Sequence, residues 1–125
     1  MVRHSYAGTA RFVGAVARLV LAGRGADLVE AAMRALDWNA RTLWEGRDAH
    51  RPGAEFEMIE LVDGYRAFAP LASPPRAASW RRWIGGIDPE SCYGDVFAER
   101  AEPRNGNTFA VASEQARIAA GLGGS

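Results

Sequence analysis

The feature that most constrains the fold is a helical spacing of apolar residues near the N-terminus. Between residues 9 and 22 they recur three and four positions apart, at Phe12, Val13, Val16, Leu19 and Val20. Arg11 and Arg18 lie seven positions apart on the opposite side. Because Gly23 and Gly25 follow directly, the pattern predicts an amphipathic helix that ends near residue 22.

A second amphipathic helix is predicted over residues 27–47. Asp27 followed by Glu30 resembles a capping box, in which side chains bond the free amides of the first helical turn. The expected core positions follow the helical period: Leu28, Val29, Ala32, Met33, Leu36, Ala40, Leu43 and Trp44. The opposite, solvated side is expected to carry three i,i+4 ion pairs, Glu30 with Arg34, Asp37 with Arg41 and Arg41 with Glu45.

Two later segments carry β-hairpin signals. Asp63-Gly64 separates residues 56–62 from residues 65–71, and an Asp-Gly pair favours the tight turn that joins two antiparallel strands. The second signal is Asn105-Gly106, between strands predicted over 96–101 and 108–112. We therefore expect two hairpins, and leave open whether they join into one four-stranded sheet.

Two further helices are expected around the second hairpin. Ser73 followed by two prolines is typical of a helix start, with proline in the first turn, and predicts a helix to about Ile84. A last helix is predicted over residues 113–120.

These elements follow one another in the order ααββαββα. At 125 residues the chain fits one domain with a core of its own. The predicted fold class is α+β, a single domain over residues 1–125 with helices packed on one face of the strands. Residues 1–8 and 121–125 are expected to be loose termini.

The charge balance argues against a nucleic-acid partner. All fifteen basic residues are arginines, and they are matched by fifteen Asp and Glu residues, for a net charge of zero. Proteins that bind phosphate backbones usually carry a concentrated positive surface, whereas these arginines are spread along the chain. Direct nucleic-acid binding is therefore not expected.

Residues for metal binding or catalysis are few. His4 and His50 belong to no spaced ligand set, so no metal and no cofactor are predicted. Cys92 has no imidazole base placed beside it by the sequence and is interpreted as a packing residue. A single cysteine suits a reducing, cytoplasmic setting, and Arg18 interrupts the one apolar run that could mimic a membrane or targeting segment.

Residues 76–83 combine three arginines with two tryptophans. Trp80 and Trp83 fall at the spacing of a helix that presses one stripe into a core, which leaves Arg81 and Arg82 outside. Arginine and tryptophan are also enriched among residues that dominate interface energy. Arg76, Arg81 and Arg82 are therefore candidate partner-binding residues, with a core role for the tryptophans as the favoured interpretation.

Trp38 is the fourth candidate for partner binding. On a helical wheel it lies far from the apolar stripe of its own helix, close to charged residues. One explanation is that the first helix packs on that side, near Ala31 and Ala35. The other is an exposed anchor for a partner.

The function that fits best is a small non-enzymatic module that binds a larger protein or protein complex, as an inhibitor or accessory subunit. In size and build alone, the chain is comparable to phage- and plasmid-borne inhibitors such as those that block CRISPR effector complexes. The alternative is a small ligand-binding or catalytic α+β domain with a site between subunits. An exposed face could equally serve a homodimer.

Overall fold

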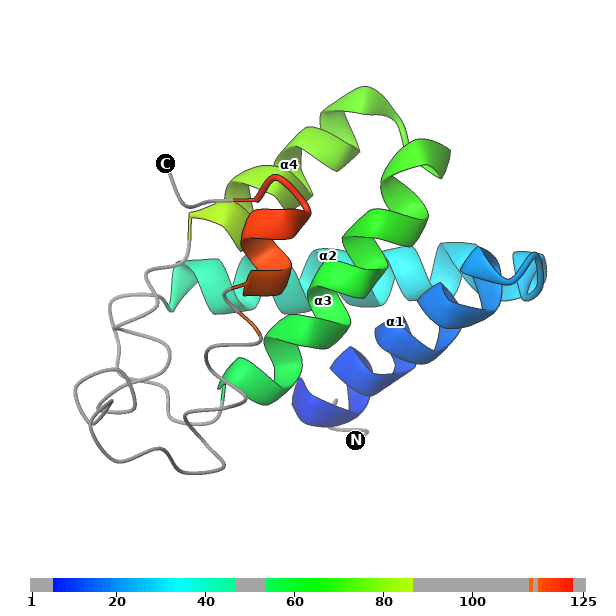
Figure 1. Ribbon diagram of the computed structural model, residues 1–125, viewed down its shortest axis with the longest axis horizontal. Coiled ribbons are helices and arrows are strands. Elements are labelled where there is room, and N and C mark those ends of the chain that lie inside the picture. The colour runs from blue at the N-terminus through cyan, green and yellow to red at the C-terminus, as the bar shows by residue number, and fades with distance from the viewer. Residues whose placement is uncertain (1–5, 47–53, 87–112, 114, 123–125) are drawn as a thin grey trace.

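The computed structural model describes residues 6–46, 54–86, 113 and 115–122, and within these ranges every regular element is a helix. Four α-helices make up most of it: α1 (Tyr6–Leu21), α2 (Val29–Glu45), α3 (Ala54–Phe68) and α4 (Pro74–Gly85). Two 3₁₀ turns join them, η1 (Ala26–Leu28) before α2 and η2 (Ala69–Leu71) before α4. A short helical segment at 115–119 packs beside them (Figure 1).

The first predicted helix is confirmed as α1. It ends where the amides of Gly23 and Arg24 bond the carbonyls of Val20 and Leu19, at 2.9 and 2.8 Å. Gly23 and Gly25 both have positive φ, 80° and 74°, which side chains other than glycine rarely adopt. The glycines therefore turn the chain sharply between α1 and η1.

The second predicted helix is confirmed as η1 and α2, but its capping box is not formed. The N-cap of α2 is Leu28, which makes no side-chain capping bond, and Glu30 pairs instead with Arg76 of α4. Of the predicted core positions, Leu28 is exposed and Val29 and Trp44 are partly buried, whereas the other five are buried, as is Asn39. The buried Asn39 amide donates to the Thr9 hydroxyl at 2.7 Å and so ties α2 to α1.

The first predicted hairpin is wrong, because residues 56–62 and 65–71 lie largely within the single helix α3, followed by η2. The fold class α+β, with strands covered on one face by helices, is therefore contradicted for the part of the chain that the structure describes. The buried side chains of α3 recur at helical intervals: Met58, Leu61, Val62, Ala67 and Phe68. The second predicted hairpin, at 96–101 and 108–112, lies outside the described residues.

Gly64 explains how an Asp-Gly pair can stand in the middle of a helix. A Cβ atom at this position would overlap the Val13 side chain and lie 3.4 Å from Leu36. Gly64 is thus required for the close approach of α3 to α1 and α2, and not for a turn. A Cβ atom at Gly14 on α1 would likewise overlap the Glu60 side chain of α3.

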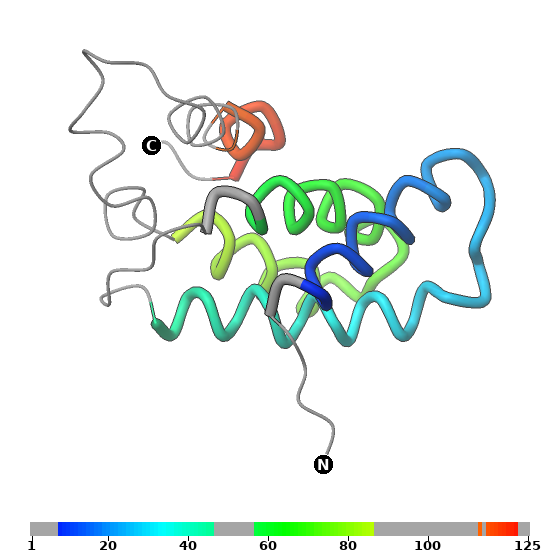
Figure 2. The backbone as a smooth tube through the Cα atoms, turned by 90° about the horizontal axis from the view of Figure 1, so that it is seen from below, coloured from blue at the N-terminus to red at the C-terminus, as the bar shows by residue number. Residues whose placement is uncertain are grey.

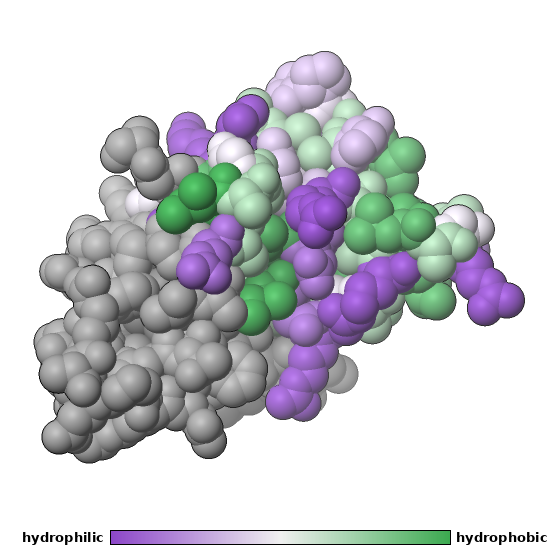
Figure 3. Space-filling view, in the orientation of Figure 1, coloured by the Kyte–Doolittle hydropathy of each residue, from purple (hydrophilic) through white to green (hydrophobic). Residues whose placement is uncertain are grey.

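The outer edge of the α1 and α3 contact is polar. Arg18 lies 3.5 Å from both Glu60 and Asp63, and its side chain stays more than half exposed. In Figure 3, hydrophilic side chains gather across the middle of the view, over these two helices. Exposed ion pairs of this kind contribute a few tenths of a kcal/mol, roughly up to 1, so they add little to the buried contact beneath.

The helix predicted to begin after Ser73 is confirmed as α4, with Ser73 as N-cap and proline in the first turn. Its buried residues are Trp80 and Ile84. The segment at 115–122 closes this end of the molecule, since Leu122 is fully buried and buried Arg117 donates to the Ile84 carbonyl at 2.9 Å.

The arrangement places α2 on one side of the molecule, with α1 and α3 across it (Figures 1 and 2). α1 packs most extensively on α3, and α4 packs on α2 and α3. Buried side chains from all four helices, together with Leu122, form one hydrophobic core. α1 and α2 lie side by side, and residues of both helices line a groove on the surface of the molecule.

Candidate functional site

Arg76, predicted as a partner-binding residue, instead joins α4 to α2 within the chain. Its Nη2 atom donates to Asp37 Oδ2 at 2.7 Å and its Nε atom bonds both oxygens of that carboxylate. Arg76 Nη1 also lies 3.3 Å from Glu30 Oε1, about two helical turns before Asp37 on α2. The hydrogen bond to Asp37 raises the pKa of the Arg76 guanidinium further above its already high ordinary value, so the group stays charged.

Trp80 also contacts both Asp37 and Arg76. Its indole Nε1 donates to Asp37 Oδ1 at 2.6 Å, and the Arg76 guanidinium carbon lies 5.7 Å from the centre of its ring. The indole is fully buried, and Trp83 packs partly buried against the core. The interpretation of both tryptophans as core residues is confirmed. Arg76, Asp37 and Trp80 thus fasten α4 to α2.

Arg81 and Arg82 remain exposed on α4. Arg81 Nη2 donates to the Gly121 carbonyl at 3.2 Å, and the Arg82 guanidinium lies 5.2 Å from the centre of the Trp44 ring. Both arginines therefore already make contacts with this chain. The structure does not bring them together with Trp38, which lies on α2 facing α1.

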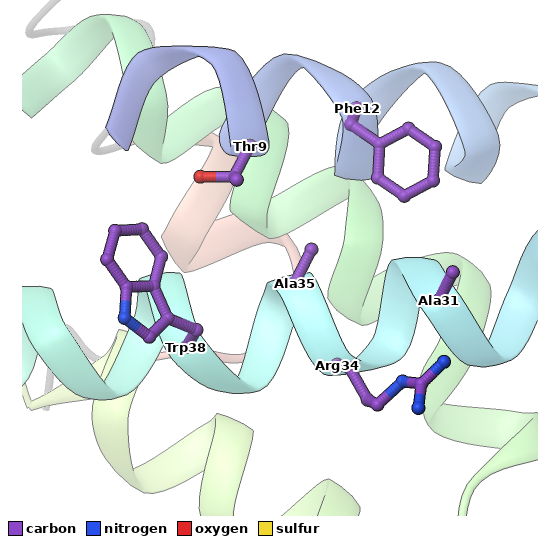
Figure 4. Close-up of a pocket in the computed structure, with 6 residues that line it drawn as sticks. All are labelled: Thr9, Phe12, Ala31, Arg34, Ala35 and Trp38. Carbon is purple, nitrogen blue, oxygen red and sulfur yellow. The ribbon is translucent and has the colours of Figure 1, made fainter. Parts of the chain in front are cut away.

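Trp38 lines a groove of about 420 Å³ between α1 and α2. The lining consists of Thr9 and Phe12 from α1 and Ala31, Arg34, Ala35 and Trp38 from α2. Figure 4 shows the Phe12 ring leaning from α1 toward α2, with Ala31 and Ala35 beneath and Trp38 rising beside Thr9. The indole is half-buried, so the packing of α1 on this side of α2 accounts for part of its surface.

Apolar side chains are also exposed along α1 and just before α2. Phe12 and Leu19 are each 38% exposed, and Leu28, at the start of α2, is 37% exposed. Along α1 and the residue after it, four apolar residues are exposed at intervals of three and four: Phe12, Ala15, Leu19 and Ala22. From η1 into α2, Leu28 and Ala31 are exposed and Ala35 and Trp38 are half-buried at the same intervals. We call these eight residues the α1–α2 stripe. Such spacing is typical of a seam between helices, and here one side of the seam is open.

The chemistry of the groove lining is simple. It consists of a phenyl ring, an indole, two alanine methyl groups, one guanidinium and a threonine whose hydroxyl already accepts from Asn39, which suits apolar contact with a polar edge. Within the described ranges no group of three or more His, Cys, Asp or Glu side chains could hold a metal ion. His4, His50 and Cys92 lie outside those ranges.

Phe12 and Leu19 belong to the apolar side of the first helix, yet the buried positions of α1 include Ala10, Val13, Val16 and Ala17 instead. Leu28, predicted as a core position of the second helix, is exposed as well. The apolar arc of the first helix is wider than the face it buries. That width, with a second set of small and apolar residues at 12, 15, 19 and 22, is the sequence signal for the open stripe.

No helix in the described ranges combines the length and apolar character needed to cross a bilayer. No known protein family, no curated protein and no solved structure matches the chain.

Proposed function

We propose that this chain is a non-enzymatic protein-binding module, an inhibitor or accessory subunit of a larger protein, and that it binds through the α1–α2 stripe. The observation that supports the proposal best is the exposure of Phe12, Leu19 and Leu28 along one seam. A fold of this size covers most of its large apolar side chains, so a row of them at interface spacing favours a partner.

The residues of the stripe have the properties of an interface centre. Phe12 and Trp38 are aromatic, and aromatic residues dominate binding energy when a partner buries them. Each already has part of its surface covered within this chain, which lowers the side-chain freedom lost on binding. The four alanines between the large residues leave hollows for a partner's side chains.

The assignment changes the role of the four predicted partner residues. Trp38 lies within the proposed surface, whereas Arg76 stabilises the fold through Asp37. Arg81 and Arg82 form a separate candidate surface on α4 and remain a prediction. Variants on the two surfaces can therefore be compared directly.

The test is capture of partners from the native host's lysate by the tagged chain, with and without nuclease. Phe12→Asp is expected to reduce capture of a stoichiometric protein partner at least about tenfold, because it places a charge in the centre of the apolar seam. Leu71→Asp is the matched control, since Leu71 is 56% exposed but lies in η2, away from the stripe. Circular dichroism should show both variants folded at the capture temperature, although Phe12→Asp is expected to melt lower because most of the Phe12 side chain is already covered.

Other outcomes would overturn the assignment. If Arg81→Glu with Arg82→Glu abolishes capture while Phe12→Asp does not, the binding surface is on α4. If every captured protein is lost on nuclease treatment, the partner is a nucleic acid and the proposal is wrong.

A further inference from the structure

We infer that the α1–α2 stripe accepts an amphipathic α-helix whose flanking positions carry carboxylates. The inference rests on the proposed function and names the chemistry of the partner segment. It draws on three observations: the length and spacing of the stripe, the sizes of its residues, and the charges along its edges.

The dimensions of the stripe fit one helix. Its two halves, residues 12–22 and 28–38, each span ten helical steps, which at 1.5 Å per step is about 15 Å, or roughly three turns. The intervals of three, four and three residues match those of a helix docking in parallel or antiparallel fashion along the seam. Recognition of a helix in a groove uses anchors at the same intervals.

The sizes of the residues also fit. Large side chains alternate with alanines at the α1 positions, where they are Phe12 and Leu19, and lie at the two ends of the other half, where they are Leu28 and Trp38. Ala31 and Ala35 form the floor between them, beneath the Phe12 ring (Figure 4). Small residues between large ones let a partner helix approach closely and insert its own apolar side chains.

The edges of the stripe are positively charged. Arg34 lines the groove, and its expected partner Glu30 is paired with Arg76 instead. By helical position Arg11 borders the stripe on α1, and Arg24 lies in the turn between the helices.

These arginines are available to a partner. Arg11, Arg24 and Arg34 form no ion pair with any residue that the structure describes, in contrast to Arg18 and Arg41, which do. Asp27 is the only carboxylate near the stripe in the described ranges without such a pair. Three cations against one anion favour a partner with acidic edges.

A second copy of the chain would fit this surface less well. It would bring the same three arginines to the edges of the same seam, and like charges across an interface are unfavourable. The charge pattern thus favours a different, acidic protein over self-association.

The test uses a displayed library of helices of roughly 18 residues with a fixed Leu and Ile face. The positions flanking that face vary among Glu, Gln and Lys, and the library is selected on the full chain. The wild type is expected to enrich Glu at these positions. Arg11→Glu with Arg34→Glu should shift the enrichment to Lys and weaken the best acidic peptide about tenfold. Phe12→Asp should abolish selection, and Leu71→Asp should not.

Enrichment with no preference of charge, or no enrichment at all, would overturn the inference. So would sedimentation showing a homodimer that Phe12→Asp dissociates. If capture from lysate depends on Phe12 but the library shows no acidic preference, the proposed function stands and this inference fails. If neither depends on Phe12, both fail.

Discussion

Replacing Trp80 with alanine is expected to lower the free energy of unfolding by about 3–5 kcal/mol, the range for removing a fully buried aromatic side chain. The indole is completely buried, and it also donates a hydrogen bond to Asp37 of α2 at 2.6 Å. Its loss leaves a cavity and removes the Trp80–Asp37 hydrogen bond between α4 and α2. Urea denaturation followed by circular dichroism measures the change.

Trp80→Phe is the matched control. It keeps most of the buried ring but lacks the indole N–H, so we expect a loss of about 1–2 kcal/mol, much smaller than for alanine. Equal stability of Trp80→Ala and the wild type would mean that the indole is not in the core. The helix bundle described above would then be wrong at α4.

Asp37→Ala is expected to cost about 2–3 kcal/mol, although its carboxylate is not deeply buried. The substitution leaves the buried Trp80 N–H without an acceptor and removes the oxygens that Arg76 bonds. The Arg76 contribution is moderated by solvent, because that side chain is 26% exposed. Chemical denaturation of the purified variant gives the value.

A double-mutant cycle separates the two parts of the loss. Arg76→Ala alone is expected to cost about 1 kcal/mol, and the double variant should cost less than the sum of the singles by about 1 kcal/mol. Strict additivity would show that Arg76 does not interact with Asp37. Arg76 would then be returned to the set of residues available for a partner.

Local sequence patterns predicted the helices that do not depend on distant contacts. α1, α2 and α4 were recognised from apolar periodicity and from the glycines and Ser73 at their ends. The sequence failed at α3 because Asp63-Gly64 is a strong local signal for a turn. Gly64 is there for the approach of α1, forty or more residues away in sequence, and no local rule carries that contact.

The same limit applies to the candidate site. Arg41 and Glu45 form the i,i+4 ion pair expected from their spacing. Glu30 and Asp37, which were expected to pair with Arg34 and Arg41, pair instead with Arg76 on α4. That exchange makes Arg76 structural and leaves Arg34 available at the groove. Trp38 stands out in the sequence because it lies off the apolar stripe of its own helix, but the groove that it lines depends on the packing of α1 on α2.

The measurement that tests the central claim most directly is photo-crosslinking in the native host. A photoreactive residue is placed at Ala31, within the α1–α2 stripe, or at Ala78, an exposed position on α4. The account predicts one discrete protein adduct from Ala31 that Phe12→Asp abolishes, and none from Ala78. An adduct from Ala78 and none from Ala31, or equal diffuse labelling from both, would contradict the proposal that this chain binds its partner through the stripe.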